Sequence, residues 1–129
     1  KLLDLFGCCD VYISTHRSEG FGRFIAESLQ LGLDVLATNW SGNIDYCEGP
    51  LYHPIPFDLI EVKPGDYPHW QNQYWANPDL DFAAKELKKI IKNRKFTKDV
   101  KWNYKDKFSA LNCGLRYQSR LLEIGLINE

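Results

Sequence analysis

Methionine is absent from all 129 residues of this chain, including position 1. A translation product begins with methionine, so we expect the chain to be a processed or excised piece of a longer protein. Long apolar runs are absent as well, and none approaches the eighteen or so residues that a membrane-spanning helix requires. No secretory signal peptide opens the chain. These absences argue against an integral membrane protein, and the length suits one domain over residues 1–129.

Cysteine is scarce and poorly spaced for cross-linking or metal binding. The four cysteines are Cys8, Cys9, Cys47 and Cys113, and no C-x-x-C spacing occurs among them. The three histidines do not complete a metal-ligand pattern with them. We therefore expect reduced, mostly buried thiols in a cytoplasmic protein and no metal site.

Charge is nearly balanced overall but unevenly distributed. Residues 1–81 carry twelve acidic and four basic side chains, whereas residues 85–107 carry ten Lys or Arg and three acidic residues. Such a basic stretch could contact anionic lipid at the cytoplasmic membrane face, or nucleic acid. Most charge runs are solvated helix faces, and we favour that interpretation. No nucleic-acid partner is expected, and contact with a membrane surface stays open.

The pattern of apolar residues alternates between strand and helix. A β-rich run over 10–15 predicts a buried strand, and from Phe21 apolar residues recur at helical spacing until Gly32 stops the helix. A second strand is predicted over 34–38. One helix between two strands predicts a βαβ unit with parallel strands.

The rest of the chain is less regular. We expect a first helix that ends at Gly7, a helical turn over 44–48, breaks at three prolines, a strand over 59–62, an irregular aromatic-rich segment over 64–79, a helix capped by Asp79 and a last helix over 109–124. The fold class is therefore α/β, with a Rossmann-like parallel sheet flanked by helices. Residues 93–129 form its basic segment and C-terminal helix.

The junction between the first strand and its helix reads STHRSEGFGRFIAES over residues 14–28. Gly20 and Gly22 precede a helix start, where unpaired N–H groups and a partial positive charge suit an anion such as phosphate. Arg23 could add charge to the same anion, and Phe21 is expected to plug into the core. Glu19 and Glu27 flank this loop and could accept hydrogen bonds from hydroxyls. Phosphate with polyol contacts on each side describes a nucleotide sugar.

Alternatives exist for each of these residues. Glu19 could cap a helix, Glu27 could be a solvated helical residue, and turns use glycine routinely. The joint occurrence at one junction favours the binding interpretation. Because ligands bind at the carboxyl ends of parallel strands, we expect the loop over 39–45 to share one crevice with this junction. His16 could orient donor oxygens there, or be a loop histidine with no special role.

These residues resemble the E-x7-E motif of retaining GT-B glycosyltransferases of family 4, with Glu19 and Glu27 as the two glutamates. The resemblance covers residues 2–92. It is carried further by Cys9-Asp10-Val11-Tyr12-Ile13-Ser14, Ala26-Glu27-Ser28-Leu29 with Gly32 and Val35, Thr38-Asn39-Trp40-Ser41-Gly42-Asn43, Asp66-Tyr67-Pro68 and Trp75-Ala76-Asn77-Pro78-Asp79.

The resemblance implies a role for each site residue. Glu27 would bind the nucleotide ribose, Glu19 would lie near the donor hexose and support the transition state, and amides around Phe21 would meet the hexose or phosphates. The loop over 41–45 would also face the donor. The expected site is catalytic Glu19 and His16, with donor-binding Gly20, Phe21, Gly22, Arg23, Glu27, Ser41, Gly42, Asn43 and Asp45. Such enzymes generally need no metal ion, and we expect no cofactor beyond the nucleotide diphosphate sugar itself.

Two departures from the family pattern matter. Arg23 and Phe24 stand where many relatives have Leu and Pro, and no Arg-x4-Lys pair precedes the motif. With the missing methionine, this leads us to expect a carboxyl-terminal fragment that lacks its N-terminal domain and is inactive alone. The complete enzyme would transfer a hexose to a glycan or lipid-linked acceptor. The resemblance suggests mannose or glucose as this hexose. The rival interpretation is a non-catalytic nucleotide-binding or regulatory α/β module.

Two further features have competing interpretations. Asp79-Leu80-Asp81 matches the D-x-D tripeptide that holds a metal in the other glycosyltransferase fold, but we interpret it as a helix start. The aromatic residues at positions 67, 70, 74 and 75 could stack on a sugar or base. We expect them instead to pack a long loop onto the sheet.

Overall fold

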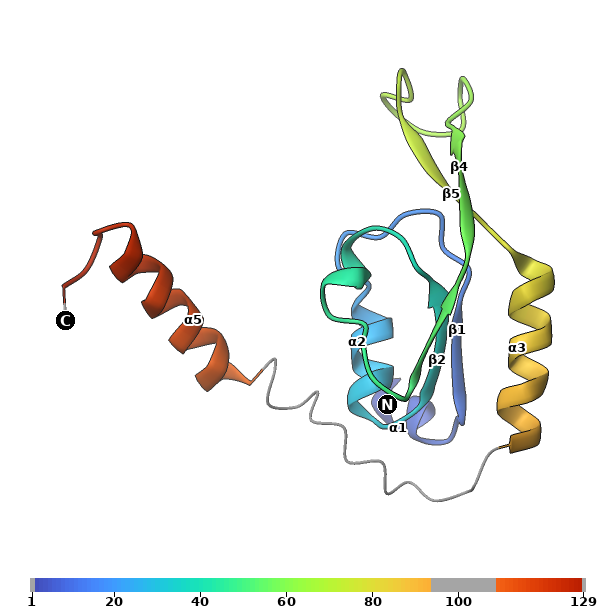
Figure 1. Ribbon diagram of the computed structural model, residues 1–129, viewed down its shortest axis with the longest axis horizontal. Coiled ribbons are helices and arrows are strands. Elements are labelled where there is room, and N and C mark those ends of the chain that lie inside the picture. Colours follow the sequence, from blue (N-terminus) through green and yellow to red (C-terminus); the bar gives the residue numbers. More distant parts are fainter. Residues whose placement is uncertain (1, 94–108, 129) are drawn as a thin grey trace.

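A parallel three-stranded sheet forms the centre of the protein, whose computed structural model describes residues 2–93 and 109–128. The strands are β1 (Val11–Ser14), β2 (Asp34–Thr38) and β3 (Tyr52–Ile55), in the order β1-β2-β3. Helix α2 (Arg23–Gln30) connects β1 to β2 (Figure 1), which confirms the predicted βαβ unit. The chain is therefore α/β, with a sheet compatible with a Rossmann-like arrangement.

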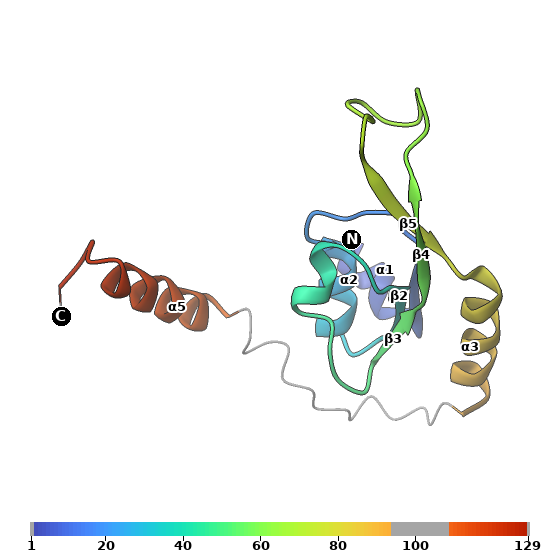
Figure 2. The same ribbon diagram turned by 45° about the horizontal axis from the view of Figure 1, so that its top comes forward.

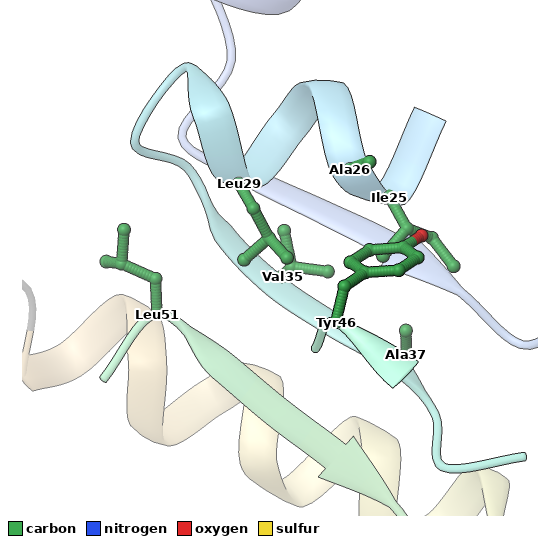
Figure 3. Close-up of a cluster of buried hydrophobic side chains, with 7 residues drawn as sticks. All are labelled: Ile25, Ala26, Leu29, Val35, Ala37, Tyr46 and Leu51. Atoms are coloured by element: carbon green, nitrogen blue, oxygen red, sulfur yellow. The ribbon is translucent and has the colours of Figure 1, made fainter. Parts of the chain in front are cut away.

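Strand β2 is covered on both faces. Successive side chains of a strand point in opposite directions, so its residues contribute alternately to the two sides. Val35 and Ala37 pack toward α2, in a cluster that Figure 3 shows with Ile25, Ala26, Leu29, Tyr46 and Leu51. Leu36 packs on the other side with Ile55 and with residues of helix α3 (Leu80–Asn93). Figure 1 shows α2 and α3 on opposite faces of the sheet. This double cover is typical of parallel sheets.

Helix α2 begins at Arg23, two residues later than the apolar spacing predicted. Gly22 has φ 74° and ψ 56°, a left-handed backbone conformation that cannot continue a helix. Gly32, with φ 79°, stands just beyond the helix end as predicted. The two glycines therefore set the limits of α2, and Phe21 belongs to the loop before it.

Two strands were not predicted. Strand β3 contains Pro54, which is tolerated because β3 pairs only with β2 and lies at the edge of the described sheet. The other is β5 (Tyr74–Pro78), inside the segment expected to be irregular, which pairs antiparallel with β4 (Phe57–Glu61), the strand predicted over 59–62. The resulting hairpin projects from the sheet domain in both orientations of the ribbon (Figures 1 and 2).

The remaining elements are short or peripheral. Helix α1 (Leu2–Gly7) ends at Gly7 as predicted, the 3-10 turn η1 (Gly42–Asp45) begins two residues earlier than expected, and helix α5 (Ala110–Glu123) lies apart from the sheet in Figure 1. Among the helices of the described ranges, none is long and apolar enough to cross a membrane.

The helix starts expected at Asp79 and Ser109 are confirmed. An Asp79 carboxylate oxygen accepts a hydrogen bond from the Phe82 N–H at 2.8 Å, and the Ser109 hydroxyl accepts one from the Asn112 N–H at 3.2 Å. Side-chain caps of this kind satisfy N–H groups that a helix leaves unpaired. Asp79 in the D-x-D tripeptide is therefore the N-terminal cap of α3.

Two expectations about the surface have different outcomes. Cys8 and Cys9 are exposed and the other two cysteines are partly exposed, so the prediction of mostly buried thiols was wrong. The lysines at positions 85, 88, 89 and 92 lie exposed on α3, as expected for a solvated helix face. The basic residues at 94–107, and the lipid contact considered for them, lie outside the described residues.

Candidate functional site

The loops that follow β1 and β2 lie at the same edge of the sheet, as predicted, and they touch directly. The Gly42 N–H donates to the Glu19 carbonyl at 3.0 Å, and the Glu19 N–H donates to the Ser41 hydroxyl oxygen at 2.7 Å. A Cβ on Gly42 would lie 2.6 Å from the carbonyl carbon of Gly20 and closer still to its oxygen. The two loops therefore form one joined unit.

Ser41 holds an unusual backbone conformation at this contact. Its φ of 70° and ψ of −154° fall in a region that is populated almost entirely by glycine. Such a conformation costs on the order of 1–3 kcal/mol and persists only where the surroundings enforce it. The hydrogen bond from Glu19 to the serine hydroxyl gives a physical reason for a side chain at this strained position.

His16 and Asn43 form a second link between the loops. The His16 Nε2 atom lies 3.0 Å from Asn43 Oδ1 and 3.1 Å from the Trp40 carbonyl, while Nδ1 lies 2.9 Å from the Ser14 hydroxyl. The Asn43 Nδ2 group donates to the Thr38 carbonyl at 3.0 Å, so Oδ1 faces the histidine. Because both partners of Nε2 are acceptors, Nε2 carries a proton and donates.

This network bears on the roles assigned to its two members. Asn43 is fully buried, and both ends of its amide are engaged within the protein. Both ring nitrogens of His16 are likewise engaged by protein groups. In this arrangement the two residues hold the loops in place. For the Asn43 amide to contact a sugar donor directly, one of these hydrogen bonds would have to break.

Tyr46 anchors the glycine loop, and the sequence analysis missed it. Its hydroxyl lies 2.6 Å from the Phe21 carbonyl oxygen and 2.7 Å from the Gly22 carbonyl oxygen, and the residue is buried. Phe21 does not plug into the core as expected: it is 49% exposed, and its ring packs on Tyr46 with the centroids 4.7 Å apart. Phe21 and Tyr46 are 25 positions apart, so no local sequence pattern indicates their contact. The helical turn predicted around Tyr46 places it one turn after Asn43 but does not show what its ring contacts.

The phenol of Tyr46 gives the site a testable dependence on pH. Burial raises its pKa, and nearby negative groups, first Cys47 and then Glu19, raise it further. The unfolded state therefore loses this proton above about pH 10 while the folded state keeps it, so the unfolding free energy falls with rising pH by up to about 1.4 kcal/mol per pH unit. Tyr46→Phe should flatten this alkaline slope in urea denaturation series at several pH values.

A control separates Tyr46 from other tyrosines. Tyr117 is exposed on α5, so Tyr117→Phe should leave the slope unchanged. Some slope should remain in Tyr46→Phe, because burial also raises the pKa of Tyr12. Equal slopes in the wild-type and Tyr46→Phe proteins would contradict the assignment.

The start of α2 offers donors and one acceptor together. Gly22 is its N-cap residue and makes no side-chain cap hydrogen bond, so it does not satisfy the N–H groups that a helix start leaves unpaired. The Arg23 Nε–H donates to Glu27 Oε1 at 2.6 Å, with the Arg23 side chain 80% exposed. Glu27 Oε2 is buried and has no hydrogen-bond partner among the described residues. A buried acceptor without a partner is uncommon in proteins, and Ser28 Oγ and Trp75 Nε1 are the other buried side-chain atoms of the described residues in this situation.

The other predicted residues lie around this start. Gly20 and Asp45 are exposed, and Glu19 lines a hollow on the side of the β4–β5 hairpin. Within the described ranges, no group of three or more His, Cys, Asp or Glu residues could hold a metal ion. Comparison of the chain with models of protein families, with curated proteins and with solved structures found no match. The site's own chemistry consists of N–H donors, one exposed guanidinium and an acceptor carboxylate.

Proposed function

We propose that this chain is the donor-binding part of a retaining glycosyltransferase of the GT-B, family 4 type. The observation that carries the proposal is the unpartnered Oε2 atom of Glu27, buried one helical turn beyond the uncapped start of α2. A sugar nucleotide supplies both missing groups, since its phosphates accept from the helix N–H groups and a ribose hydroxyl donates to Glu27.

The reaction proposed for the complete enzyme is hexosyl transfer from a nucleotide diphosphate sugar. The bond between the anomeric carbon and the diphosphate oxygen breaks, and a bond from that carbon to an acceptor hydroxyl oxygen forms with the same anomeric configuration. The hydroxyl proton leaves with the diphosphate. Negative charge grows on the departing oxygen, which the start of α2 and Arg23 stabilise.

The loop contacts support this proposal by fixing the site before a ligand arrives. Glu19 is held through both its N–H and its carbonyl by residues 41 and 42, and the Gly22 carbonyl is held by Tyr46. A preorganised site does not have to order its loops when it binds, which lowers the cost of binding. In the proposed complex, Glu19 lies beside the donor hexose.

Glu27→Ala tests the proposal through binding. Alanine keeps the helix and removes the acceptor, so the affinity for a nucleotide sugar should fall by about 1–3 kcal/mol, which corresponds to roughly 5- to 150-fold in Kd. Isothermal titration calorimetry with UDP-glucose and GDP-mannose measures the change.

The matched control is Glu61→Ala, which removes an exposed glutamate from β4 and should leave the affinity unchanged. If Glu27→Ala binds as tightly as the wild type, Glu27 is not part of the site. If the wild-type chain binds neither nucleotide sugar nor the nucleotides alone, the proposal fails. If it binds nucleotides with no gain from the sugar, the rival interpretation as a nucleotide-binding module takes its place.

A further inference from the structure

A hollow of about 640 Å³ lies between the loop after β1 and the β4–β5 hairpin. The loop contributes Arg17 and Glu19, and the hairpin contributes Tyr67, Tyr74 and Trp75. Its size falls within the range of about 300–1,000 Å³ that is typical of small-molecule pockets. Strand β5 of the hairpin, which was not predicted from the sequence, therefore helps to build a site that shares Glu19 and Gly20 with the proposed donor site.

The two walls of the hollow are fastened to each other. The Ala76 N–H donates to the Arg17 carbonyl at 2.9 Å, which ties β5 to the loop. The Arg17 guanidinium lies over the Trp75 ring, 5.0 Å from its centroid, a cation–π contact. This pairing of main chain and side chain gives the hollow a defined shape without a ligand.

The chemistry of the lining is aromatic with polar groups at its margin. Tyr67 is 64% exposed and Tyr74 is 59% exposed, so these rings do not pack onto the sheet as expected. The polar residues Arg17, Glu19 and Gln73 line the same space. Exposed aromatic surface ringed by polar groups marks a binding site.

A sugar ring fits this lining better than other ligands. One face of a pyranose presents C–H groups that pack on an aromatic ring, and its edge presents hydroxyls that both donate and accept hydrogen bonds. Arg17 supplies donors, Glu19 supplies acceptors and Gln73 supplies both. Arg17 and Glu19, which carry opposite charges, both line the hollow, and this balance disfavours a polyanion such as nucleic acid.

We propose that this hollow binds the neutral glycan acceptor of the transfer reaction, with Tyr67 and Tyr74 as the stacking surfaces. The inference rests on the proposed function, which places the donor hexose near Glu19. Because Glu19 lines the hollow, a sugar bound there lies on the hairpin side of the same residue. The acceptor hydroxyl and the donor hexose then meet at Glu19.

Titration with disaccharides, followed by NMR, tests the inference. Maltose and α-mannobiose serve as probes, and the Trp75 indole N–H signal, identified by its loss in Trp75→Phe, reports on the hollow. We expect a saturable shift of this signal with at least one probe. Tyr74→Ala should weaken the binding by about tenfold, the amount expected when a stacking ring is lost. Tyr117→Ala, which removes an exposed tyrosine from α5, should leave it unchanged.

A second variant protects the test against a folding defect. Tyr74 belongs to β5 and is paired with Glu61, whereas Tyr67 lies outside both strands. Tyr67→Ala therefore leaves the strand pairing intact and should also weaken disaccharide binding. Binding unchanged in both variants, or shifts confined to residues outside the hollow, would overturn the inference.

The two proposals fail in different ways. Nucleotide-sugar binding that depends on Glu27, together with no shift from either disaccharide, overturns the acceptor site and leaves the donor site standing. Disaccharide binding without any nucleotide binding overturns the transferase, and the acceptor role falls with it. Glu27→Ala should weaken the binding of the nucleotide sugar and leave the binding of the disaccharide unchanged. Both results together would support both proposals.

Discussion

Gly42→Ala is expected to lower the unfolding free energy by about 3 kcal/mol, at the upper end of what overpacking costs in proteins. The new methyl group would overlap the Gly20 carbonyl, and its neighbour there is main chain, which cannot rotate away as a side chain can. The loops after β1 and β2 must then separate. Separation breaks the hydrogen bond from the Gly42 N–H to the Glu19 carbonyl and adds to the loss.

Urea denaturation of the two alanine variants at Gly42 and Gly20 measures this effect. Gly20 is the matched control, because a Cβ there would have no neighbour within 4 Å and its backbone is not left-handed. Gly20→Ala should change the unfolding free energy by less than about 0.5 kcal/mol, as surface substitutions usually do. Similar midpoints for the two variants would show that the loops are not in close contact in solution.

Asn43→Ala is expected to destabilise the protein by about 3 kcal/mol. The substitution leaves the Thr38 carbonyl and the His16 Nε2 group without the amide that pairs with them, and each buried unpaired group costs about 1–3 kcal/mol. His16 keeps the Trp40 carbonyl as a partner, which limits its share of the loss. The fully buried side chain also leaves a cavity when it is shortened.

The control for Asn43 is its neighbour in the same loop. Asn39 is exposed, and its side-chain oxygen accepts one hydrogen bond from the Tyr52 hydroxyl at 3.1 Å. Thermal and urea unfolding should show a loss below about 1 kcal/mol for Asn39→Ala, since an exposed hydrogen bond is replaced by water. Asn43→Ala should in addition weaken nucleotide-sugar binding, because the loops lose a link. An effect of Asn43→Ala no larger than that of Asn39→Ala would contradict the network.

The βαβ unit could be predicted because its signals are local. The apolar spacing of α2, the glycine after it and the β-rich runs on either side lie within 30 residues. Strands β3 and β5 could not be predicted, because their pairing depends on partners elsewhere in the chain and β propensity is a weak signal by itself. Pro54 argued against a strand, and only the edge position of β3 makes it acceptable.

In the candidate site, too, the features with local sequence signals could be predicted and those that depend on distant contacts could not. Gly22 was identified from its place before a helix, and its left-handed backbone accounts for the choice of residue. Gly42 is required by contact with a loop 22 residues earlier, which no local pattern reveals. Tyr46 and the hairpin aromatics were missed or misjudged for the same reason, since their partners are set by the fold. The start of α2 was therefore predictable, whereas the contacts that hold it were not.

Strand β2 belongs to both hydrophobic clusters, with Val35 and Ala37 in one and Leu36 in the other. If either cluster is disrupted, one face of β2 becomes exposed to solvent. The strand is then less stable, and the other cluster loses part of its support. The sheet and its two covering helices should therefore melt as one cooperative unit, in which local damage is felt throughout. In hydrogen exchange, the amides of this middle strand should be the last to exchange, because they open only when the whole unit opens.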